Sequence, residues 1–432
     1  MDGKFLELAR AATAGSSQVR PIGELPDYSR VRSFSRSQDD ELAPVVRLQL
    51  VDDDGVLEWE DVSGMPPDLG RFRSATPTKT PTECEAFEME FQRLPPSKIT
   101  QFLSGRDDKL TPHRGLRRLN TETGKLEAAP FPNNGDALVF VHGTFSNSEN
   151  MLAGLLDKEN LIGNEFLEQA AKRFGENLYA FDHPTLAVSP ILNAFDLQRA
   201  MGRSDAKIRV VSHSRGGLVS RWWCETFDQS GDRCDRVVFV GSPLAGTGLA
   251  APPNIRDTIH LLTQFSRALQ YASGMAAIAI PVFSVVEAML RVVTSITSLG
   301  ARTPVVDAAM AMVPGLFGMS RVGNNPELRR LLETASMHTE RYYAVCSDFQ
   351  PSDPGWKFWR MFRKDQLIDS AADLLFDGAN DLVVDTPSMN DLADDVAIDS
   401  KRVLDFRQSP MVHHLNYFYQ PETAKFLADA LL

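Results

Sequence analysis

The stretch VVSHSRGGLVSR, residues 210–221, joins a predicted buried strand to a predicted helix. The strand KIRVVSH (207–213) runs directly into a helix that begins near Gly216. Small residues stand two positions before and two positions after Ser214, as Ser212 and Gly216, and they allow the backbone to turn sharply. Such a turn lifts the serine side chain out of the sheet and points the N-terminus of the next helix towards it. Ser214 is therefore our candidate nucleophile.

Predicted strands and helices alternate on both sides of this turn. The further strand candidates are residues 137–143, 177–183, 236–242, 341–347 and 402–408. The helix candidates are residues 151–174, 192–201, 216–227 and 417–432. Continuous apolar strands are typical of a sheet that is covered on both faces. Because the strands alternate with helices, the sequence predicts an α/β domain with a mainly parallel sheet and flanking helices.

The N-terminal part of the chain has a different pattern of apolar and polar residues. Its first 15 residues are amphipathic, which predicts a short helix, and the polar, aperiodic residues that follow predict a mobile linker. Alternating strand patterns with turn residues between them then predict hairpins, a β-rich extension of the main domain. We therefore expect a helix and linker at 1–44, a β-hairpin-rich region at 45–130 and an α/β domain at 131–432.

A long apolar insert interrupts the α/β domain at residues 250–335. It contains several helix candidates and few charges. Such excursions at the carboxyl ends of strands are where α/β sheets keep their ligand-covering elements, so we interpret the insert as lid-like. Any transient contact with a membrane or lipid surface is expected at residues 257–320 of this insert.

The most apolar part of the insert is Tyr271–Leu290. A membrane-spanning helix needs about 20 apolar residues. This stretch contains Pro281 and Glu287, and Arg291 follows it directly. A buried or substrate-facing helix pair is therefore favoured over a membrane span.

Composition excludes several classes of protein. At 43% hydrophobic and 24% charged residues, a chain of 432 residues is typical of globular proteins that bury a large core. The formal net charge of −12 argues against a nucleic-acid partner, which would select a basic surface. The N-terminus lacks the apolar core of a secretory signal, so we expect a cytoplasmic protein, with signal-independent export as the alternative.

The four cysteines, Cys84, Cys224, Cys234 and Cys346, fit no zinc motif. We interpret them as free thiols, although Cys224 and Cys234 are near enough in sequence to be bridged. The acidic run at 52–54 is interpreted as a solvated turn rather than a calcium site. No cofactor and no metal are expected.

Two segments resemble motifs of the α/β-hydrolase family. Residues 210–221 resemble its nucleophile elbow, G-x-S-x-G, with Ser212 in place of the first glycine. VFVHGTFSN (139–147), with the pair His142-Gly143, resembles the oxyanion-hole loop of lipases. This resemblance implies that the backbone N–H groups of Thr144 and Arg215 stabilise negative charge on a carbonyl oxygen.

A third segment, VGSPLAGTGLA (240–250), resembles the turn that lipases place close to the nucleophile. A serine nucleophile also needs a histidine base and a carboxylate that fixes the tautomer of that base. The family orders these residues as serine, acid, histidine. His413 and His414 lie before the final predicted helix, where the family places the base. We favour His414, with His413 as the alternative, and expect His213 to point into the sheet.

The acid is expected in the segment FDGANDLVVDTPSM, residues 376–389. Its Asn-Asp pair, followed by Leu-Val-Val, resembles the N-D-G-x-V loop of bacterial lipases, with Leu382 in place of the glycine. The resemblance implies that Asp381 is the acid, and Asp377 and Asp385 are the alternatives.

Taken together, the sequence resembles a lipase or esterase with the α/β-hydrolase fold. The resemblance implies that Ser214, Asp381 and His414 cleave a lipophilic carboxylic ester through an acyl-enzyme, with His142, Gly143 and Gly216 in support. A phospholipase or thioesterase would use the same triad. A catalytically inactive scaffold that binds a lipid or a protein is the alternative from another class. The oligomeric state is left open.

Overall fold

The chain divides into two compact units in a computed structural model. Unit 1 combines residues 1–99, 255–309 and 353–361, and unit 2 combines residues 100–254, 310–352 and 362–432. The structure describes residues 3–13, 18–22, 45–53, 56–61, 86–228, 231–250, 259–260, 262–264, 266–267, 276–296, 312–321, 325–333, 338–350 and 378–432.

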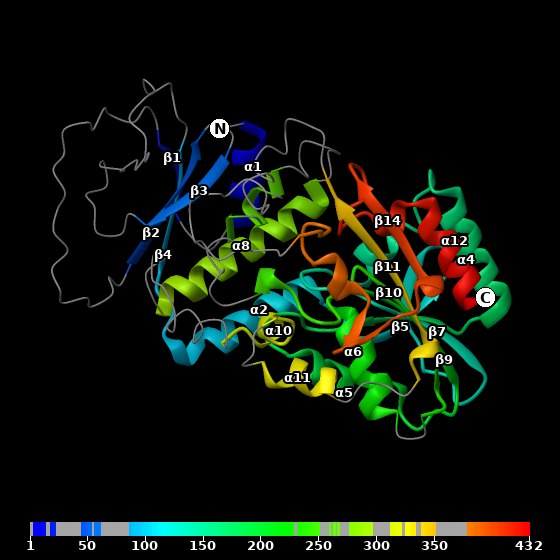
Figure 1. The fold of residues 1–432 in the computed structure, drawn as a ribbon. Coiled ribbons are helices and arrows are strands. Elements are labelled where there is room, and N and C mark those ends of the chain that lie inside the picture. Colours follow the sequence, from blue (N-terminus) through cyan, green and yellow to red (C-terminus); the bar gives the residue numbers. More distant parts are fainter. Residues whose placement is uncertain are drawn as a thin grey trace. The chain divides into compact units, whose positions relative to one another are not determined.

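Unit 1 contains a small antiparallel sheet and two described helices (Figure 1). The strands follow the order β1 (Gln18–Ile22), β4 (Ala86–Gln92), β2 (Val45–Asp53) and β3 (Val56–Asp61). The helices are α1 (Gly3–Thr13) and α8 (Ala276–Ile296). The N-terminal helix and the first hairpin are therefore as predicted. Residues 18–22 are not a linker but an edge strand that pairs with β4. An edge strand tolerates Pro21, which has no N–H to donate, whereas a central strand would lose a ladder hydrogen bond there.

Aromatic side chains fill the core of unit 1. The ring of Phe283 in α8 lies 5.8 Å from that of Phe5 in α1 and 6.4 Å from that of Phe87 in β4. The indole N–H of Trp59 donates to the hydroxyl of Thr263 at 3.0 Å. Part of the predicted insert thus shares one core with the N-terminal elements. Among the described helices, none combines the length and apolarity that a bilayer crossing requires.

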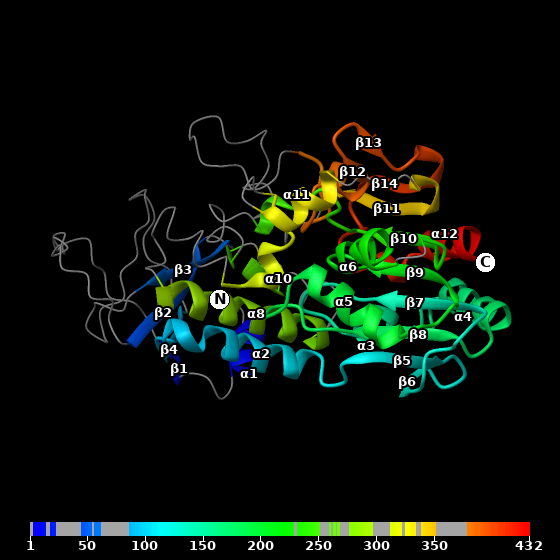
Figure 2. The same cartoon turned by 90° about the horizontal axis from the view of Figure 1, so that it is seen from below.

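Unit 2 is built on a sheet of eight strands, whose order is visible in Figure 2. Six strands are parallel, and a hairpin at one edge is antiparallel. The parallel strands are, in spatial order, β14 (Val403–Ser409), β11 (Tyr342–Phe349), β10 (Cys234–Val240), β9 (Lys207–His213), β7 (Asp136–Val141) and β8 (Leu178–Asp182). The hairpin consists of β5 (Gly115–Asn120) and β6 (Lys125–Ala128). These two strands come from the predicted region 45–130 but extend the main sheet.

Helices cover both faces of this sheet (Figure 1). Helices α4 (Leu161–Phe174) and α12 (Pro421–Leu431) bury apolar side chains against one face. Helices α5 (Pro190–Met201) and α6 (Gly216–Trp222) pack together on the other. The remaining described helices and strands are α2 (Ile99–Leu110), α3 (Ser148–Leu152), α10 (Pro314–Phe317), α11 (Pro326–Glu333), β12 (Asp391–Ala393) and β13 (Val396–Ala397). The expected α/β architecture, a mainly parallel sheet with flanking helices, is confirmed.

One predicted helix, residues 151–174, is in fact two. Helix α3 ends at Leu152, and α4 begins after Asn160, whose side chain accepts a hydrogen bond from Gly163 N–H at 3.0 Å. An asparagine at this position satisfies one of the N–H groups that the first turn of a helix leaves unpaired.

The strand order places a topological switch point between β7 and β9. The chain passes from β7 to β8 on one side and then to β9 on the other. Ligands of open α/β sheets bind outside the carboxyl ends of the strands at such a point. The segment after β7 carries His142 and Gly143, and the segment after β9 carries Ser214.

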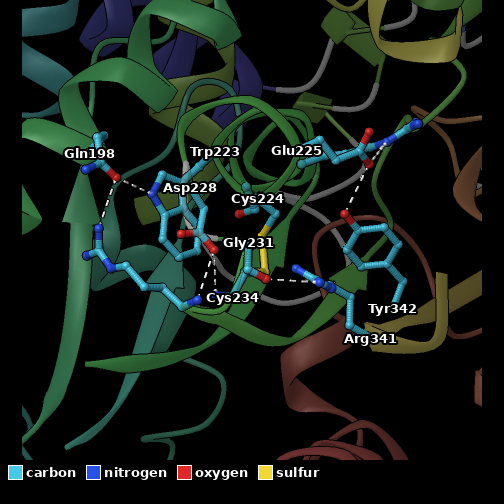
Figure 3. Close-up of a disulfide and its surroundings, with 12 residues drawn as sticks. Gln198, Trp223, Cys224, Glu225, Asp228, Gly231, Cys234, Arg341 and Tyr342 are labelled. Atoms are coloured by element: carbon cyan, nitrogen blue, oxygen red, sulfur yellow. Dashed lines mark hydrogen bonds and ion pairs between the residues drawn. A yellow bond between two sulfur atoms is a disulfide. The ribbon is translucent and has the colours of Figure 1, made fainter. Parts of the chain in front are cut away.

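A disulfide links Cys224 to Cys234, with their Cα atoms 5.6 Å apart (Figure 3). Cys224 lies in the π-helical turn Trp223–Phe227 that follows α6, and Cys234 begins β10. The interpretation of these two cysteines as free thiols is therefore wrong. Cys346 is free and buried, and Cys84 lies outside the described residues. Because disulfides persist mainly in oxidising compartments, the bridge weighs against the cytoplasmic expectation.

The bridge is expected to stabilise the fold by restricting the unfolded chain. It closes a loop between residues ten apart in sequence, for which the chain-entropy model gives about 3 kcal/mol. Replacing both cysteines by serine should therefore lower the free energy of unfolding by about 2–3 kcal/mol in urea denaturation. A reductant should lower the stability of the wild type and leave that of the double variant unchanged. Equal stability of the oxidised and reduced wild type would contradict this account.

Candidate active site

Ser214 occupies a strained turn between β9 and α6. Its backbone has a φ of +53°, a left-handed conformation that is uncommon for residues other than glycine. The N–H of Ser214 donates to the carbonyl of Val240 at 2.9 Å, and its carbonyl accepts from the N–H of Gly217 at 2.9 Å. Strain of this kind persists where the surrounding structure enforces it, and it clusters at functional sites. The backbone therefore has the conformation that a nucleophile elbow requires.

Glycines around Ser214 are required by close backbone packing. A Cβ atom on Gly216 would lie 2.3 Å from the carbonyl oxygen of Val141, at the end of β7. A Cβ atom on Gly143 would lie 2.6 Å from the Cβ of Ser214. One on Gly217 would lie 2.4 Å from the Cβ of Ser242. The residues after β7, β9 and β10 thus meet at the elbow with no room for larger side chains.

Asp381 and His414 form a buried hydrogen-bonded pair. The Nδ1 of His414 lies 2.8 Å from the Oδ2 of Asp381. The backbone N–H of His414 also donates to the carbonyl of Asp381 at 3.0 Å. The other carboxylate oxygen, Oδ1, accepts from the N–H groups of Val383 and Val384 at 3.1 and 2.9 Å. Because the carboxylate is fixed on both oxygens, it holds Nδ1 as the protonated ring nitrogen and leaves Nε2 with a free lone pair.

Residue 382 stands where the resembled loop has glycine. Leu382 has a φ of +95°, so the loop keeps the left-handed turn without the residue that adopts it most easily. The N–H of Leu382 donates to the side chain of Asn380 at 3.1 Å, and that of Asp381 to the carbonyl of Val384. The departure from the family pattern therefore leaves the loop geometry intact.

Two contacts bring the pair to the elbow. The Nε2–H of His213, the neighbour of Ser214, donates to the carbonyl of His414 at 2.8 Å, and the two rings lie 4.9 Å apart. Gly241 follows Val240, whose carbonyl accepts the hydrogen bond from the N–H of Ser214, and it has a φ of +55°. A Cβ atom on it would lie 3.0 Å from the Oδ2 of Asp381 and 3.3 Å from the Nδ1 of His414. The three candidate residues thus gather at the carboxyl ends of β9 and β10.

The ring of His213 does not simply point into the sheet, as the sequence suggested. It packs against His414 and, edge to face, against Phe418, whose ring lies 5.7 Å away. Burial lowers the pKa of His213 to about 3, so its ring is neutral at pH 7. A neutral ring that donates through Nε2 supports the backbone of the candidate base without adding charge beside it.

The alternative residues occupy other positions. Burial lowers the pKa of His413 to about 4, and its ring stacks edge to face on Phe349. The carboxylate of Asp385 forms an ion pair with Arg321 at 3.2 Å. Asp377 lies outside the described residues. The hydrogen-bonded pair of the structure is therefore Asp381 with His414.

The loop after β7 is held by the buried ring of His142. Its Nδ1–H donates to the carbonyl of Gly143 at 2.8 Å, and its Nε2 accepts from the N–H of His183 at 3.2 Å. Burial lowers the pKa of His142, so the ring stays neutral and can donate through one nitrogen while it accepts through the other. The N–H of the next turn residue, Phe145, donates to the hydroxyl of Thr185 at 3.2 Å. The path of the backbone through Thr144 is thus fixed from both ends.

Sequence reasoning missed a buried carboxylate that organises this region. Asp107 of α2 accepts hydrogen bonds from the N–H groups of Thr185, Leu186 and Ala187 at 2.8, 2.9 and 2.8 Å. It therefore fixes the loop whose threonine holds Phe145. Its partners are about 80 residues away in sequence, and no local pattern pointed to them.

The side chain of Arg215 also has a structural role that the sequence did not reveal. Its buried guanidinium donates through Nε to the carbonyl of Gly315 at 3.1 Å and through Nη2 to the side chain of Asn193 at 2.7 Å and to the carbonyl of Val188. Burial lowers the pKa of Arg215 to about 10. The guanidinium thus ties the start of α6 to two neighbouring segments.

The backbone N–H groups of Thr144 and Arg215 are available as donors. Neither has an acceptor among the described residues. Arg215 directly precedes α6, and the first N–H groups of a helix have no partner within it. The described residues contain no group of three or more histidine, cysteine or acidic side chains arranged to hold a metal ion.

The model of a protein family described as "Domain of unknown function (DUF7379)" matches residues 110–432. The chain belongs to this family. The match spans the whole eight-stranded sheet of unit 2, from β5 onward, and all the candidate site residues. No curated protein matches the sequence.

Solved structures similar to this chain include a lipase, a carboxyl esterase and an epoxide hydrolase. Lipase 1 from Pelosinus fermentans is 14% identical, over 68% of this chain and 98% of that chain, with a TM-score of 0.41. A metagenomic carboxyl esterase is 17% identical, over 78% and 89%, with a TM-score of 0.33. An epoxide hydrolase from metagenomes of hot environments is 12% identical, over 74% and 99%, with a TM-score of 0.32. At these identities the activity must be argued from the site itself.

Proposed function

We propose that this protein is a serine hydrolase that cleaves carboxylic esters, with Ser214 as nucleophile, His414 as base and Asp381 as acid. The observation that carries the proposal is the 2.8 Å hydrogen bond between His414 Nδ1 and Asp381 Oδ2 beside a strained serine turn. The nucleophile, the acid and the base then come from three separate loops at the carboxyl end of the sheet, in the chain order serine, acid, histidine.

The reaction begins at the hydroxyl of Ser214, which donates its proton to Nε2 of His414 as Oγ attacks the acyl carbonyl. Asp381 stabilises the imidazolium that forms and keeps Nδ1 protonated. His414 then gives the proton from Nε2 to the leaving alcohol, and the acyl group stays on Ser214. Water, activated by the same imidazole, releases the carboxylic acid and restores the serine.

The negative charge of the tetrahedral intermediate rests on the N–H groups of Thr144 and Arg215. Two observations support this role. Neither N–H group has an acceptor among the described residues, and neighbouring side chains hold both segments in place. His142 and Thr185 fix the loop on one side, and the guanidinium of Arg215 fixes the start of α6 on the other. Donors placed in advance contribute about 3–4 kcal/mol to transition-state stabilisation for each N–H in comparable sites.

A fluorophosphonate probe tests the proposal, because it reacts with a serine only when a base activates the hydroxyl. The probe should label the folded protein once, and peptide mapping should place the label on Ser214. Labelling of another serine, or no labelling of a folded sample, would contradict the assignment.

We further propose that the acyl group of the ester is lipophilic. Residues 312–319, MVPGLFGM, are mostly apolar, and the sulfur of Met319 lies 3.6 Å from the hydroxyl of Thr144. An apolar side chain thus stands beside the proposed oxyanion donor, where it favours contact with an alkyl chain. The kcat/KM for p-nitrophenyl octanoate should exceed that for the acetate by at least about tenfold. A clear preference for acetate in the same assay would overturn this substrate class.

A further inference from the structure

Asp381 Oδ2 accepts a second hydrogen bond that the proposed reaction does not use. The hydroxyl of Tyr417 donates to this oxygen at 2.9 Å, and the Nδ1 of His414 donates to it at 2.8 Å. The other oxygen is already occupied by two backbone N–H groups. The phenol therefore contacts the one carboxylate oxygen that touches the candidate base.

Tyr417 is held firmly in this position. It begins the 3-10 turn Tyr417–Tyr419, three residues after His414, and its side chain is almost fully buried. The ring lies against Gly241, where a Cβ atom would come within 2.7 Å of Cε2. The hydroxyl also lies 3.8 Å from the sulfur of Met389, but a thioether is a weak acceptor beside a carboxylate. The phenolic proton therefore belongs to the bond with Asp381.

The phenol acts as a donor throughout the working pH range. Burial and the neighbouring charge of Asp381 raise the pKa of Tyr417 well above its ordinary value. A phenol that stays protonated withdraws charge from the carboxylate oxygen and fixes its direction. Both effects are transmitted to the ring of His414 through the shared oxygen.

We propose that Tyr417 is a positioning residue of the catalytic triad, whose hydroxyl aims Oδ2 of Asp381 at His414 and limits how strongly that oxygen stabilises the charged imidazole. The inference rests on the proposed function of Ser214, Asp381 and His414. It adds a residue that contacts neither the substrate nor the reacting atoms.

Other titratable groups face this cluster from every element packed against it. They are His213 on β9, His413 beside the base, Cys346 on β11 and Asp405 on β14. Burial lowers the pKa values of both histidines below 5, and burial raises the pKa of the Cys346 thiol, so these three groups are neutral at pH 7. The phenol is thus the group whose removal changes the carboxylate directly.

Tyr417→Phe removes one oxygen and keeps the ring. Without the phenolic donor, Oδ2 binds the imidazolium more strongly, so the base takes up its proton at a higher pH. The low-pH side of the kcat/KM profile should therefore move up by about 0.5–1 pH unit, and kcat/KM at the optimum should fall about tenfold with KM little changed. The matched control is Tyr419→Phe, two residues along the same turn and half-buried, which should move neither quantity.

The outcomes separate the inference from the function on which it rests. If wild type neither hydrolyses esters nor reacts with a fluorophosphonate, the proposed function fails. If wild type is active and the folded Tyr417→Phe protein keeps the wild-type profile, the role of Tyr417 fails alone. A loss of kcat without a shift of the profile would assign Tyr417 to stability only. Should the variant not fold, 3-fluorotyrosine at this position gives a stronger donor, and the profile must then move to lower pH.

Discussion

Replacing Ser214 by alanine is expected to lower kcat for ester hydrolysis by a factor on the order of 10⁶ and to abolish fluorophosphonate labelling. The substitution removes the Oγ atom that forms the acyl-enzyme in the proposed reaction and leaves the N–H groups of Thr144 and Arg215 in place. These donors alone give catalysis of about 10³–10⁴-fold over water, so some slow turnover should remain measurable. Initial rates with a p-nitrophenyl ester at high protein concentration supply the comparison.

The matched control for this variant is Ser212→Ala. Ser212 is buried on the same strand, two residues before the elbow, and its hydroxyl donates to the carbonyl of Val238 at 3.4 Å. This change removes the same oxygen from the same region but touches no candidate catalytic residue. Activity should stay within about tenfold of wild type. If Ser214→Ala keeps its hydrolysis or its label, another residue is the nucleophile.

The elbow could be predicted from sequence because its requirements are local. Ser212 and Gly216 are small for a reason that the sequence already contains, namely that a strand must turn into a helix within two residues. The structure shows in addition that Gly216 packs against the carbonyl of Val141. Strand β7 was equally predictable from the sequence, because burial on both faces of a sheet leaves an unbroken apolar run.

The residues that support the site could not be predicted, because they act through contacts between distant segments. Asp107 binds a loop about 80 residues away, and His213 binds the carbonyl of a residue 201 positions later. The sequence offers only a weak signal for Tyr417, which follows His414 by three residues at the start of a predicted helix. A buried polar residue needs a hydrogen-bond partner, but the sequence alone does not show which distant residue that partner is.

Leu382 illustrates another case, in which the sequence shows a departure from a motif but does not show how the loop accommodates it. The left-handed φ of +95° costs free energy, about 1–3 kcal/mol for such backbone strain. The carboxylate of Asp381 offsets that cost by accepting from the two N–H groups that follow, those of Val383 and Val384. The acid therefore stabilises the loop that presents it, and a glycine is not needed.

Asp381→Asn is the second change for which we expect a very large effect, a loss in kcat of about 10⁴-fold. The amide oxygen can replace Oδ1 and keep the hydrogen bonds from Val383 and Val384. The amide nitrogen then faces both His414 and Tyr417, where the carboxylate offered an acceptor. Because an amide N–H is a donor, the imidazole must move its own proton to Nε2. In that tautomer it cannot accept the proton of Ser214.

Asp385→Asn separates this effect from the general cost of losing a buried carboxylate. Asp385 lies four residues along the same loop, is equally buried and pairs with Arg321. Its replacement should lower the free energy of unfolding by about 1 kcal/mol, because the Arg321 side chain is partly exposed and water can solvate its charge, while kcat stays within about tenfold. If both variants lost activity equally, the defect would lie in the loop rather than in the tautomer of His414. A large loss confined to Asp381→Asn, in a protein that unfolds at nearly the wild-type denaturant concentration, requires the carboxylate to act through the imidazole.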